Sequence, residues 1–356
     1  MDYEKLLRTE PYKMERQEKE KSYLSYMAEL TRYHRKHCGP YGKFLDVSGC
    51  ADNFERLDQV PMLPVSVFKK QNLYSIQKEE IFKILTSSGT TGQQVSKIYL
   101  DRETAARQQK TLSVIMEDFL GSKRIPMLIL DSPDVLKDRK MFSARGAGIL
   151  GFSIFASERL FAFDRDMQLD LKAVEQFLEK HQGEHIFVFG FTYMIWQCFV
   201  EKLRHLGRTL PIPGGFMLHG GGWKKLHDIA VTGEEFQAAI YETCGIKNVR
   251  NYYGMVEQTG CIYMECEYGH LHASVFSEVI TRRARDFSAC QIGEEGLIQV
   301  MSPMAWSYPG YSLLTEDQGV ILGKDDCPCG RKGTYFKVNG RIKRAEIRGC
   351  SDTYER

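Results

Sequence analysis

Apolar runs and polar breaks alternate along most of this chain, and they predict a succession of strands and helices. Short apolar runs with little alternation, which is typical of strands buried on both faces, occupy residues 126–131 and 185–190, and further short strands are expected at residues 216–219 and 249–253. We expect helices over residues 102–119, before the first of these strands, and over residues 167–181 and 193–206, on either side of the strand at 185–190. Alternation of strand and helix predicts a mostly parallel sheet with helices on its faces.

The two ends of the chain have different patterns. Residues 1–38 carry Tyr, Met and Leu at helical spacing, which predicts one or two amphipathic helices that cover a core. Residues 60–69 are punctuated by proline and expected to be extended, and from about residue 261 the pattern is β-rich. We therefore expect a helical region over 1–60, an α/β core over 61–260, a β-rich subdomain over 261–340 and a hinge-like tail over 341–356.

The composition narrows the class of protein. With 356 residues, of which 43% are hydrophobic and 12% aromatic, the chain can form a large globular core. A net charge of +2 carries no nucleic-acid signature. We expect no membrane span, because no apolar run is long enough, and the charged start of the sequence lacks a secretory apolar core. Ten cysteines without such a signal favour a reducing, cytoplasmic environment.

One loop stands out for its chemistry. It lies between expected strands near residues 81–85 and 96–100, and it consists of Ser87, Ser88, Gly89, Thr90, Thr91 and Gly92. Its glycines allow a tight turn, and its hydroxyls and N–H groups can surround an anion such as a nucleotide phosphate. The loop lacks the Gly-Lys-Ser/Thr ending of a Walker loop, and six residues alone fit a surface hairpin equally well. Asp101, just after the second strand, is placed to cap a helix that begins near Arg102.

Two further glycine-containing loops follow expected strands. One contains Gly220, Gly221, Gly222 and Lys224, and the other contains Tyr253, Gly254 and Glu257. Open α/β sheets bind their ligands at the carboxyl ends of strands. Both loops are therefore candidates for a ligand site.

Together these loops resemble the motifs of a known group of enzymes. Ser87–Gly92, Tyr253–Glu257, Thr315–Asp317 and Gly340–Arg341 occur in the order seen in adenylate-forming enzymes, which activate a carboxylic acid with ATP. More closely, the chain resembles the acyl-protein synthetase (LuxE) family. The motifs that carry this resemblance are Pro61-x-x-Pro64-Val65-Ser66-Val67-Phe68-Lys69, the loop 87–92, His219-Gly220-Gly221-Gly222-Trp223-Lys224, Tyr253–Gln258 and Glu346-Ile347-Arg348-Gly349-Cys350.

The resemblance implies a fold and a set of site residues. The fold would be α/β: the large N-terminal domain of adenylate-forming enzymes, with layered, mostly parallel sheets and helices, a β-rich subdomain and a truncated C-terminal lid. The glycine loop would close on the β- and γ-phosphates through Thr90 and Thr91, while Glu257 would hold Mg²⁺. The remaining residues implied in nucleotide binding are Gly220, Gly221, Gly222, Tyr253, Gly254, Asp317 (at the ribose hydroxyls) and Arg341 (near ribose and phosphate).

Two positions depart from the adenylate-forming pattern. Val256 stands where a threonine usually precedes the Mg²⁺-binding glutamate, and this variant suits the acyl-protein synthetases. Glu316 replaces the middle glycine of the usual Thr-Gly-Asp. This second departure puts the geometry around Asp317 in question.

The resemblance also implies that the acyl group is carried by the protein itself. Cys350, Glu257 and Lys224 are the implied catalytic residues, and Cys350 would accept the acyl group from acyl-AMP as a thioester. Lys343, Arg344 and Arg348 precede this thiol, and neighbouring cations lower a thiol pKa. The lid of adenylate-forming enzymes usually follows the Gly-Arg hinge, whereas here Arg341 is followed only by residues up to Arg356. The implied substrates are ATP·Mg²⁺ and a carboxylic acid, which we expect to be a fatty acid. The implied partner is an acyl-CoA-reductase-like protein.

Two other kinds of protein stay open at this point. The first is a CoA ligase of the phenylacetate type or another adenylate-using acyl transferase, against which the missing lid counts. The second is a nucleotide-binding regulatory or scaffold protein without chemistry, against which the retained motif residues count. The sequence does not identify the acid.

A cysteine and histidine cluster in the β-rich part suggests a metal. Cys266, His272, Cys327 and Cys329 offer four soft ligands for tetrahedral Zn²⁺. The Cys-x-Cys spacing is tighter than usual for a structural site. Reduced cysteines in a turn-rich subdomain are an equally good interpretation of this spacing.

Overall fold

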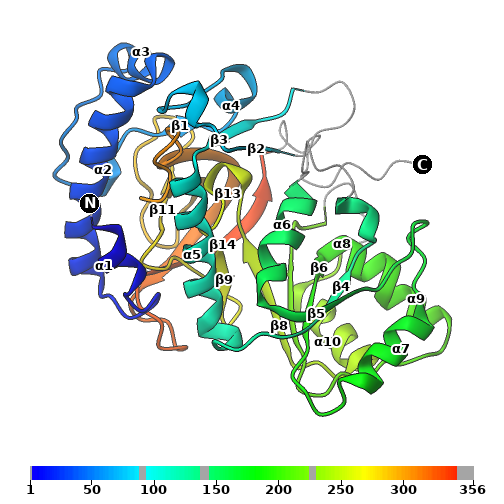
Figure 1. The fold of residues 1–356 in the computed structure, drawn as a ribbon. Helices are drawn as coiled ribbons and strands as arrows, with labels where there is room; N and C mark the ends of the chain where they lie inside the picture. Colours follow the sequence, from blue (N-terminus) through cyan, green and yellow to red (C-terminus); the bar gives the residue numbers. More distant parts are fainter. Residues whose placement is uncertain (1, 88–93, 137–143, 224–229, 343–356) are drawn as a thin grey trace. The chain divides into compact units, whose positions relative to one another are not determined.

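The computed structural model describes residues 2–87, 94–136, 144–223 and 230–342 of the chain. The fold forms two compact units, which are coloured along the sequence in Figure 1. Unit 1 combines the chain up to Asp118 with the chain from Gly254 onward, and unit 2 consists of Phe119–Tyr253. The four regions expected along the sequence stay a prediction.

A parallel sheet forms the centre of unit 2, and its order is β5-β4-β6-β7-β8. The strands are β4 (Ile125–Leu130), β5 (Ala156–Phe161), β6 (Phe187–Phe191), β7 (Phe216–Gly220) and β8 (Asn248–Tyr253). All five residues of β6 are buried, as the lack of alternation predicts. Gly220 at the end of β7 lies opposite Phe191 and Tyr252, so the loops after these strands leave from one edge of the sheet.

Helices surround this sheet (Figure 1). They are α6 (Ala144–Phe152), α7 (Leu171–Lys180), α8 (Thr192–Met194), a π-helix (Ile195–Val200), α9 (Glu201–His205) and α10 (Gly233–Cys244), with 3-10 turns at Pro133–Leu136 and Ser153–Phe155. Helix α7 begins at Leu171, later than the expected residue 167. Asp170 caps it, because the Asp170 side chain accepts the Ala173 N–H at 3.0 Å. The expected helix over 193–206 is confirmed, with a π-helical centre.

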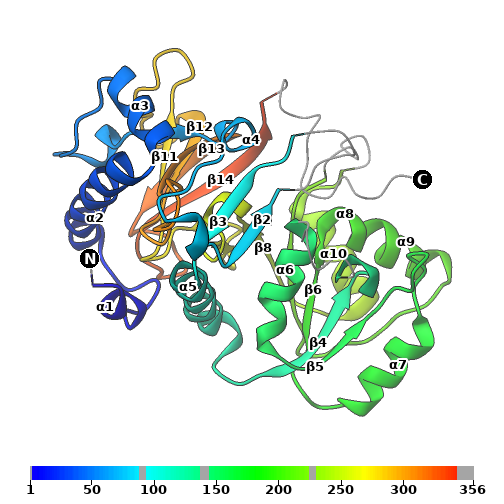
Figure 2. The same ribbon diagram turned by 45° about the horizontal axis from the view of Figure 1, so that its top comes forward.

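Unit 1 contains an antiparallel sheet with the order β11-β12-β13-β14-β10-β9. Its strands are β9 (Tyr263–Glu265), β10 (Leu271–His272), β11 (Glu278–Arg282), β12 (Glu295–Met301), β13 (Ser312–Lys324) and β14 (Thr334–Arg341), and β1 (Leu63–Pro64) pairs with β13 in parallel. This confirms the β-rich pattern expected after residue 261. A separate hairpin, β2 (Lys83–Thr86) and β3 (Lys97–Leu100), can be followed in Figure 2.

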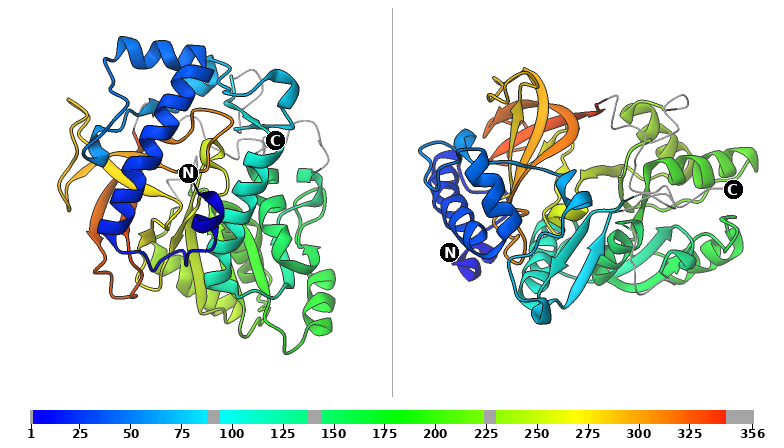
Figure 3. Two further views of the ribbon diagram at one scale, coloured as in Figure 1. Left: turned by 60° about the vertical axis from the view of Figure 1, so that its left-hand side comes forward. Right: turned by 90° about the horizontal axis from the view of Figure 1, so that it is seen from above.

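Helices of unit 1 pack on the antiparallel sheet, as Figure 3 shows for the N-terminal ones. The helices are α1 (Tyr3–Leu7), α2 (Arg16–His37), α3 (Gly39–Val47), α4 (Val67–Lys70) and α5 (Arg102–Leu120), with 3-10 turns at Leu57–Gln59, Lys78–Glu80 and Val256–Gln258. The Tyr23 hydroxyl of α2 donates to the Val275 carbonyl at 3.0 Å. Asp101 caps α5 as expected, since its Oδ1 accepts the Thr104 N–H at 2.7 Å.

The extended segment expected over 60–69 is wrong at its end, because Val67–Lys70 forms one helical turn that the Gln71 N–H closes on the Val67 carbonyl. Among the residues that the structure describes, no helix is both long and apolar enough to cross a membrane.

Candidate functional site

The base of the glycine loop lies on the β2–β3 hairpin. The Ser87 N–H donates to the Ser96 carbonyl at 3.1 Å, and the Ser96 N–H donates to the Ser87 hydroxyl at 2.9 Å. These bonds close the loop where it leaves and rejoins the strands, so a hairpin does support it. Ser88, Gly89, Thr90, Thr91 and Gly92 lie outside the described residues, and their phosphate-binding role stays a prediction.

Glu257 is a buried carboxylate held by its backbone. The Tyr308 hydroxyl donates to the Glu257 carbonyl at 2.8 Å, and the neighbouring Gln258 amide donates to the Gly310 carbonyl at 2.8 Å. Burial raises the pKa of Glu257, and the Ser96 hydroxyl counteracts this most strongly among the surrounding side chains. Because Ser96 also closes the glycine loop, this carboxylate lies next to the base of that loop.

Asp317 and Arg341 face each other across the β13–β14 pair. They are directly opposite in the strand register, and the Arg341 Nε lies 3.4 Å from the Asp317 Oδ1. The Asp317 N–H donates to the Thr315 hydroxyl at 3.2 Å, which fixes the backbone at this point of β13. The positive charge of Arg341 also lowers the pKa of Glu257. Unit 1 therefore brings together Glu257, Asp317 and Arg341, which the sequence places far apart.

Lys69 is a member of this cluster that the sequence analysis did not select. Its Nζ lies 3.9 Å from the Glu316 Oε2, and its charge lowers the pKa of Glu257. The turn of α4 carries it there. Glu316 replaces the glycine of the usual Thr-Gly-Asp, and in the structure its carboxylate pairs with Lys69. The signal was present, since Lys69 ends the proline-containing motif 61–69.

The Gly220–Gly222 loop belongs to unit 2. Gly221 and Gly222 have φ values of +80° and +63°, which favour glycine. A Cβ on Gly220 would come within 2.6 Å of the Tyr252 ring, and one on Gly221 within 2.8 Å of Phe191. The loop backbone therefore packs closely on two aromatic rings. Its predicted role beside adenine is untested, as are those of Tyr253 and Gly254.

His219, just before this loop, is held in one tautomer. The Thr192 hydroxyl donates to the Gly220 carbonyl at 3.0 Å, so it accepts from the His219 Nδ1–H at 2.9 Å. Burial lowers the pKa of His219 to about 3, and the ring is neutral. The Phe236 ring lies 4.5 Å from it. This pair of His219 and Thr192 orders the end of β7, and spacing alone gave no sign of it.

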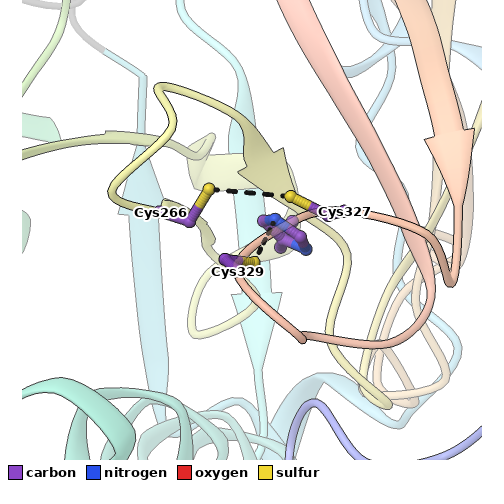
Figure 4. Close-up of side chains that lie close together, drawn as sticks. Cys266, Cys327 and Cys329 are labelled. Atoms are coloured by element: carbon purple, nitrogen blue, oxygen red, sulfur yellow. Dashed lines mark hydrogen bonds between the residues drawn. The ribbon is translucent and has the colours of Figure 1, made fainter.

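The predicted metal ligands converge in unit 1. One ligand atom from each of Cys266, His272, Cys327 and Cys329 lies within 4.8 Å of the others, and Figure 4 shows the three sulfur atoms turned toward one another. Burial lowers the pKa of His272 to about 3, so its ring is neutral. The cysteines of the described residues are free thiols.

The two remaining catalytic candidates cannot be placed. Lys224 and Cys350 both lie outside the described residues. Their roles stay predictions that rest on the resemblance.

Comparisons with known proteins point to one protein family. A family model described as acyl-protein synthetase, LuxE, matches residues 2–356. A long-chain-fatty-acid–luciferin-component ligase of Vibrio harveyi is 24% identical over 341 residues, which cover 90% of this chain and 84% of that protein. The corresponding ligase of Aliivibrio fischeri is also 24% identical, over 91% of this chain and 85% of that protein.

Solved structures identify the fold. A 2-hydroxyisobutyryl-CoA ligase, in an open conformation with its acyl-AMP and CoA, superposes with a TM-score of 0.71 over 93% of this chain and 77% of that one. Sequence identity is 15%. The predicted α/β fold of adenylate-forming enzymes is thereby confirmed.

Proposed function

This chain belongs to the acyl-protein synthetase (LuxE) family, and on that premise we propose that it activates a fatty acid with ATP and carries the acyl group on Cys350. The observation that carries the first half is the cluster in unit 1. Glu257, Asp317, Arg341 and Lys69 come from four separate segments and lie next to the base of the glycine loop. Its mixture of buried carboxylate and cations suits a magnesium-bound nucleotide.

Magnesium fits Glu257. A hard divalent cation prefers carboxylate oxygens, and burial raises the pKa of Glu257 because its charge is desolvated. A bound cation would offset that cost. The ion would neutralise phosphate charge, while Arg341 would contribute a second positive charge and Asp317 would accept hydrogen bonds from the ribose hydroxyls.

The proposed reaction has two steps. In the first, a carboxylate oxygen of the acid attacks the α-phosphorus of ATP, the bond to the β-phosphate oxygen breaks, and acyl-AMP and pyrophosphate form. In the second, the Cys350 thiolate attacks the acyl carbonyl, the bond to the AMP oxygen breaks, and AMP leaves with the electron pair. The thioester then delivers the acyl group to an acyl-CoA-reductase-like partner. The luciferin-component ligase name of two relatives supports a long-chain fatty acid as substrate.

The test is a search for the covalent intermediate. Purified protein is incubated with ATP, Mg²⁺ and fatty acids of increasing length, and intact mass is recorded before and after hydroxylamine, which cleaves thioesters. The wild-type chain should gain one acyl group, Cys350→Ser should gain none, and both should exchange pyrophosphate into ATP. Cys290→Ser is the matched control, because Cys290 is a free, half-buried thiol outside every site described above.

Two results would decide against the proposal. An adduct that persists in Cys350→Ser would place the acyl group elsewhere. Acid-dependent AMP release that needs added CoA, with no adduct on any chain, would identify a CoA ligase instead.

A further inference from the structure

We propose that Cys266, His272, Cys327 and Cys329 bind one Zn²⁺ as a closed structural site that ties the β13–β14 turn to the β9–β10 hairpin. Cys266 follows β9, His272 ends β10, and the two remaining cysteines lie in the turn between β13 and β14. Three thiols and one imidazole are a donor set typical of structural zinc. This inference is independent of the proposed acyl transfer.

The distances agree with a shared tetrahedral ion. With Zn–S near 2.3 Å and Zn–N near 2.0–2.1 Å, tetrahedral geometry gives S···S distances of about 3.8 Å and S···N distances of about 3.6 Å. The Cys266 and Cys327 sulfurs lie 3.9 Å apart, and the Cys329 sulfur lies 3.4 Å from the His272 Nε2. The first of these is far beyond a disulfide bond of about 2.05 Å. All four ligand atoms lie within 4.8 Å of one another, so the cluster would contract slightly around the ion.

Two glycine turns present the sulfur ligands. The Gly269 N–H donates to the Cys266 carbonyl at 3.0 Å, and the Gly330 N–H donates to the Cys327 carbonyl at 3.0 Å. Both glycines have positive φ, +73° and +81°, so each turn needs glycine. The Tyr268 N–H lies 3.4 Å from the Cys266 sulfur and donates to it. Backbone donors of this kind stabilise a metal-bound thiolate and orient it.

Arg331 lies beside the cluster and balances its charge. Three thiolates, a neutral imidazole and Zn²⁺ carry a net charge of −1. Arg331 follows Cys329 by two positions along the chain, and its Nη2 donates to the Asp118 carboxylate of α5 at 2.9 Å. It also lies 3.3 Å from Glu267, next to the first ligand. Arg331 thereby connects the cluster to helix α5 of the same unit.

A second histidine competes for the fourth position. The His270 Nδ1 lies 3.3 Å from the Cys327 sulfur, and the Tyr335 ring stacks on both histidines. His272 is fully buried, whereas His270 is partly exposed. A closed site that excludes water needs the buried ring, so His272 is assigned as the ligand and His270 as a neighbour.

The position of the site gives it a structural purpose. β13 and β14 form one long hairpin, with Lys324 opposite Thr334 at the turn and Asp317 opposite Arg341 at the other end. The register of this pair shifts twice along its length. An ion at the turn anchors one end of the hairpin against β9–β10 and thereby holds the register that places Arg341 against Asp317.

The first measurement uses wild-type protein. We expect about one Zn²⁺ per chain by elemental analysis, and replacement by Co²⁺ should give the intense visible absorption of a tetrahedral thiolate site. In the native protein Cys266, Cys327 and Cys329 should resist alkylation until a chelator is added. A chain that, reduced and supplied with zinc, retains no metal and gives no such Co²⁺ spectrum overturns the proposal, and so does a Cys266–Cys327 disulfide in freshly purified protein.

Single substitutions assign the ligands. Cys329→Ser and His272→Ala should each lower the zinc content and shift the Co²⁺ spectrum, while His270→Ala and the distant control Cys290→Ser should retain one ion. Loss of the ion in His270→Ala but not in His272→Ala would overturn the ligand assignment. If a ligand variant does not fold, the wild-type Co²⁺ spectrum and alkylation pattern still decide the question.

Discussion

A buried ion pair in unit 1 provides a quantitative test of how this unit is held together. The Lys19 Nζ of α2 lies 3.1 Å from the Glu278 Oε2 of β11, and their side chains are only 2% and 10% exposed. The Glu278 Oε1 accepts the Val279 N–H at 3.0 Å. Burial by itself raises the pKa of Glu278, but Lys19 and other neighbouring donors outweigh it and lower that pKa. We predict that Glu278→Gln lowers the free energy of unfolding by about 3–5 kcal/mol at pH 7.

Two limits set this magnitude. At 3.1 Å and an effective dielectric constant of about 20, the attraction between the charges is about 5 kcal/mol. Without Glu278, the folded chain can also release the Lys19 proton, and neutralising a lysine of ordinary pKa 10.5 at pH 7 costs about 5 kcal/mol. The loss therefore cannot greatly exceed 5 kcal/mol.

The variant should also acquire a pH dependence of known sign. Burial already lowers the pKa of Lys19, and removing its counter-charge lowers it further. Between the folded and unfolded pKa values the unfolded chain binds more protons, so stability rises with pH, by up to about 1.4 kcal/mol per unit, until the unfolded lysine also titrates.

The assay is urea unfolding at pH 7, 8 and 9, followed by circular dichroism and by hydrogen exchange of β11. Glu15→Gln is the matched control, because the Glu15–Lys332 pair at 3.8 Å is largely exposed and should contribute less than about 1 kcal/mol. Lys19→Met combined with Glu278→Leu should recover most of the lost stability. A Glu278→Gln variant within 1 kcal/mol of the wild type, or with no rise toward pH 9, would refute the reasoning.

Three further predictions concern the proposed active site. Glu257→Gln should slow fatty-acid-dependent pyrophosphate exchange by about 100-fold or more. The unfolding temperature should not fall, because the amide removes a buried charge but keeps the shape of the side chain. Unchanged exchange would exclude Glu257 from the chemistry. Lys69→Met should raise the KM for ATP by about 10-fold, because one lost cation contact is worth roughly 1.4 kcal/mol. Glu316→Gln should raise it less. If both variants raise the KM equally, Lys69 acts only through Glu316. Gly221→Ala should lower the free energy of unfolding by about 1–3 kcal/mol, because its φ of +80° and the 2.8 Å approach to Phe191 leave no room for a Cβ. Calorimetry should show a smaller loss for the control Gly207→Ala, because the space around Gly207 is open.

Local patterns predicted most individual elements of the fold. The apolar runs that became β4, β6 and β7 are continuous because both faces of a parallel sheet are covered, and adjacent residues are enough to show this requirement. Asp101 capping α5 is equally local. By contrast, α4 was expected to be extended, since two prolines before it suggested an extended chain and nothing nearby announced one helical turn.

In the candidate site, local sequence patterns did not predict which residues from different elements come into contact. The order of the motifs named Glu257, Asp317 and Arg341, but it said nothing of Lys69, whose nearness to Glu316 depends on β1 pairing with β13. His219 was quoted as part of a motif, while its Thr192 partner is the first residue of α8, directly after the neighbouring strand β6.

The sequence by itself determined which residues could do chemistry: the hydroxyl-rich glycine loop, the separated acids and arginine, and the cysteines that offer soft ligands to a metal. Only the tertiary structure decided which of them meet. Cys266 and Cys327 are 61 positions apart, yet their sulfurs lie 3.9 Å from each other. Spacing within one element follows from the period of a helix or strand, whereas contact between elements follows from strand pairing and packing, which depend on the whole chain at once.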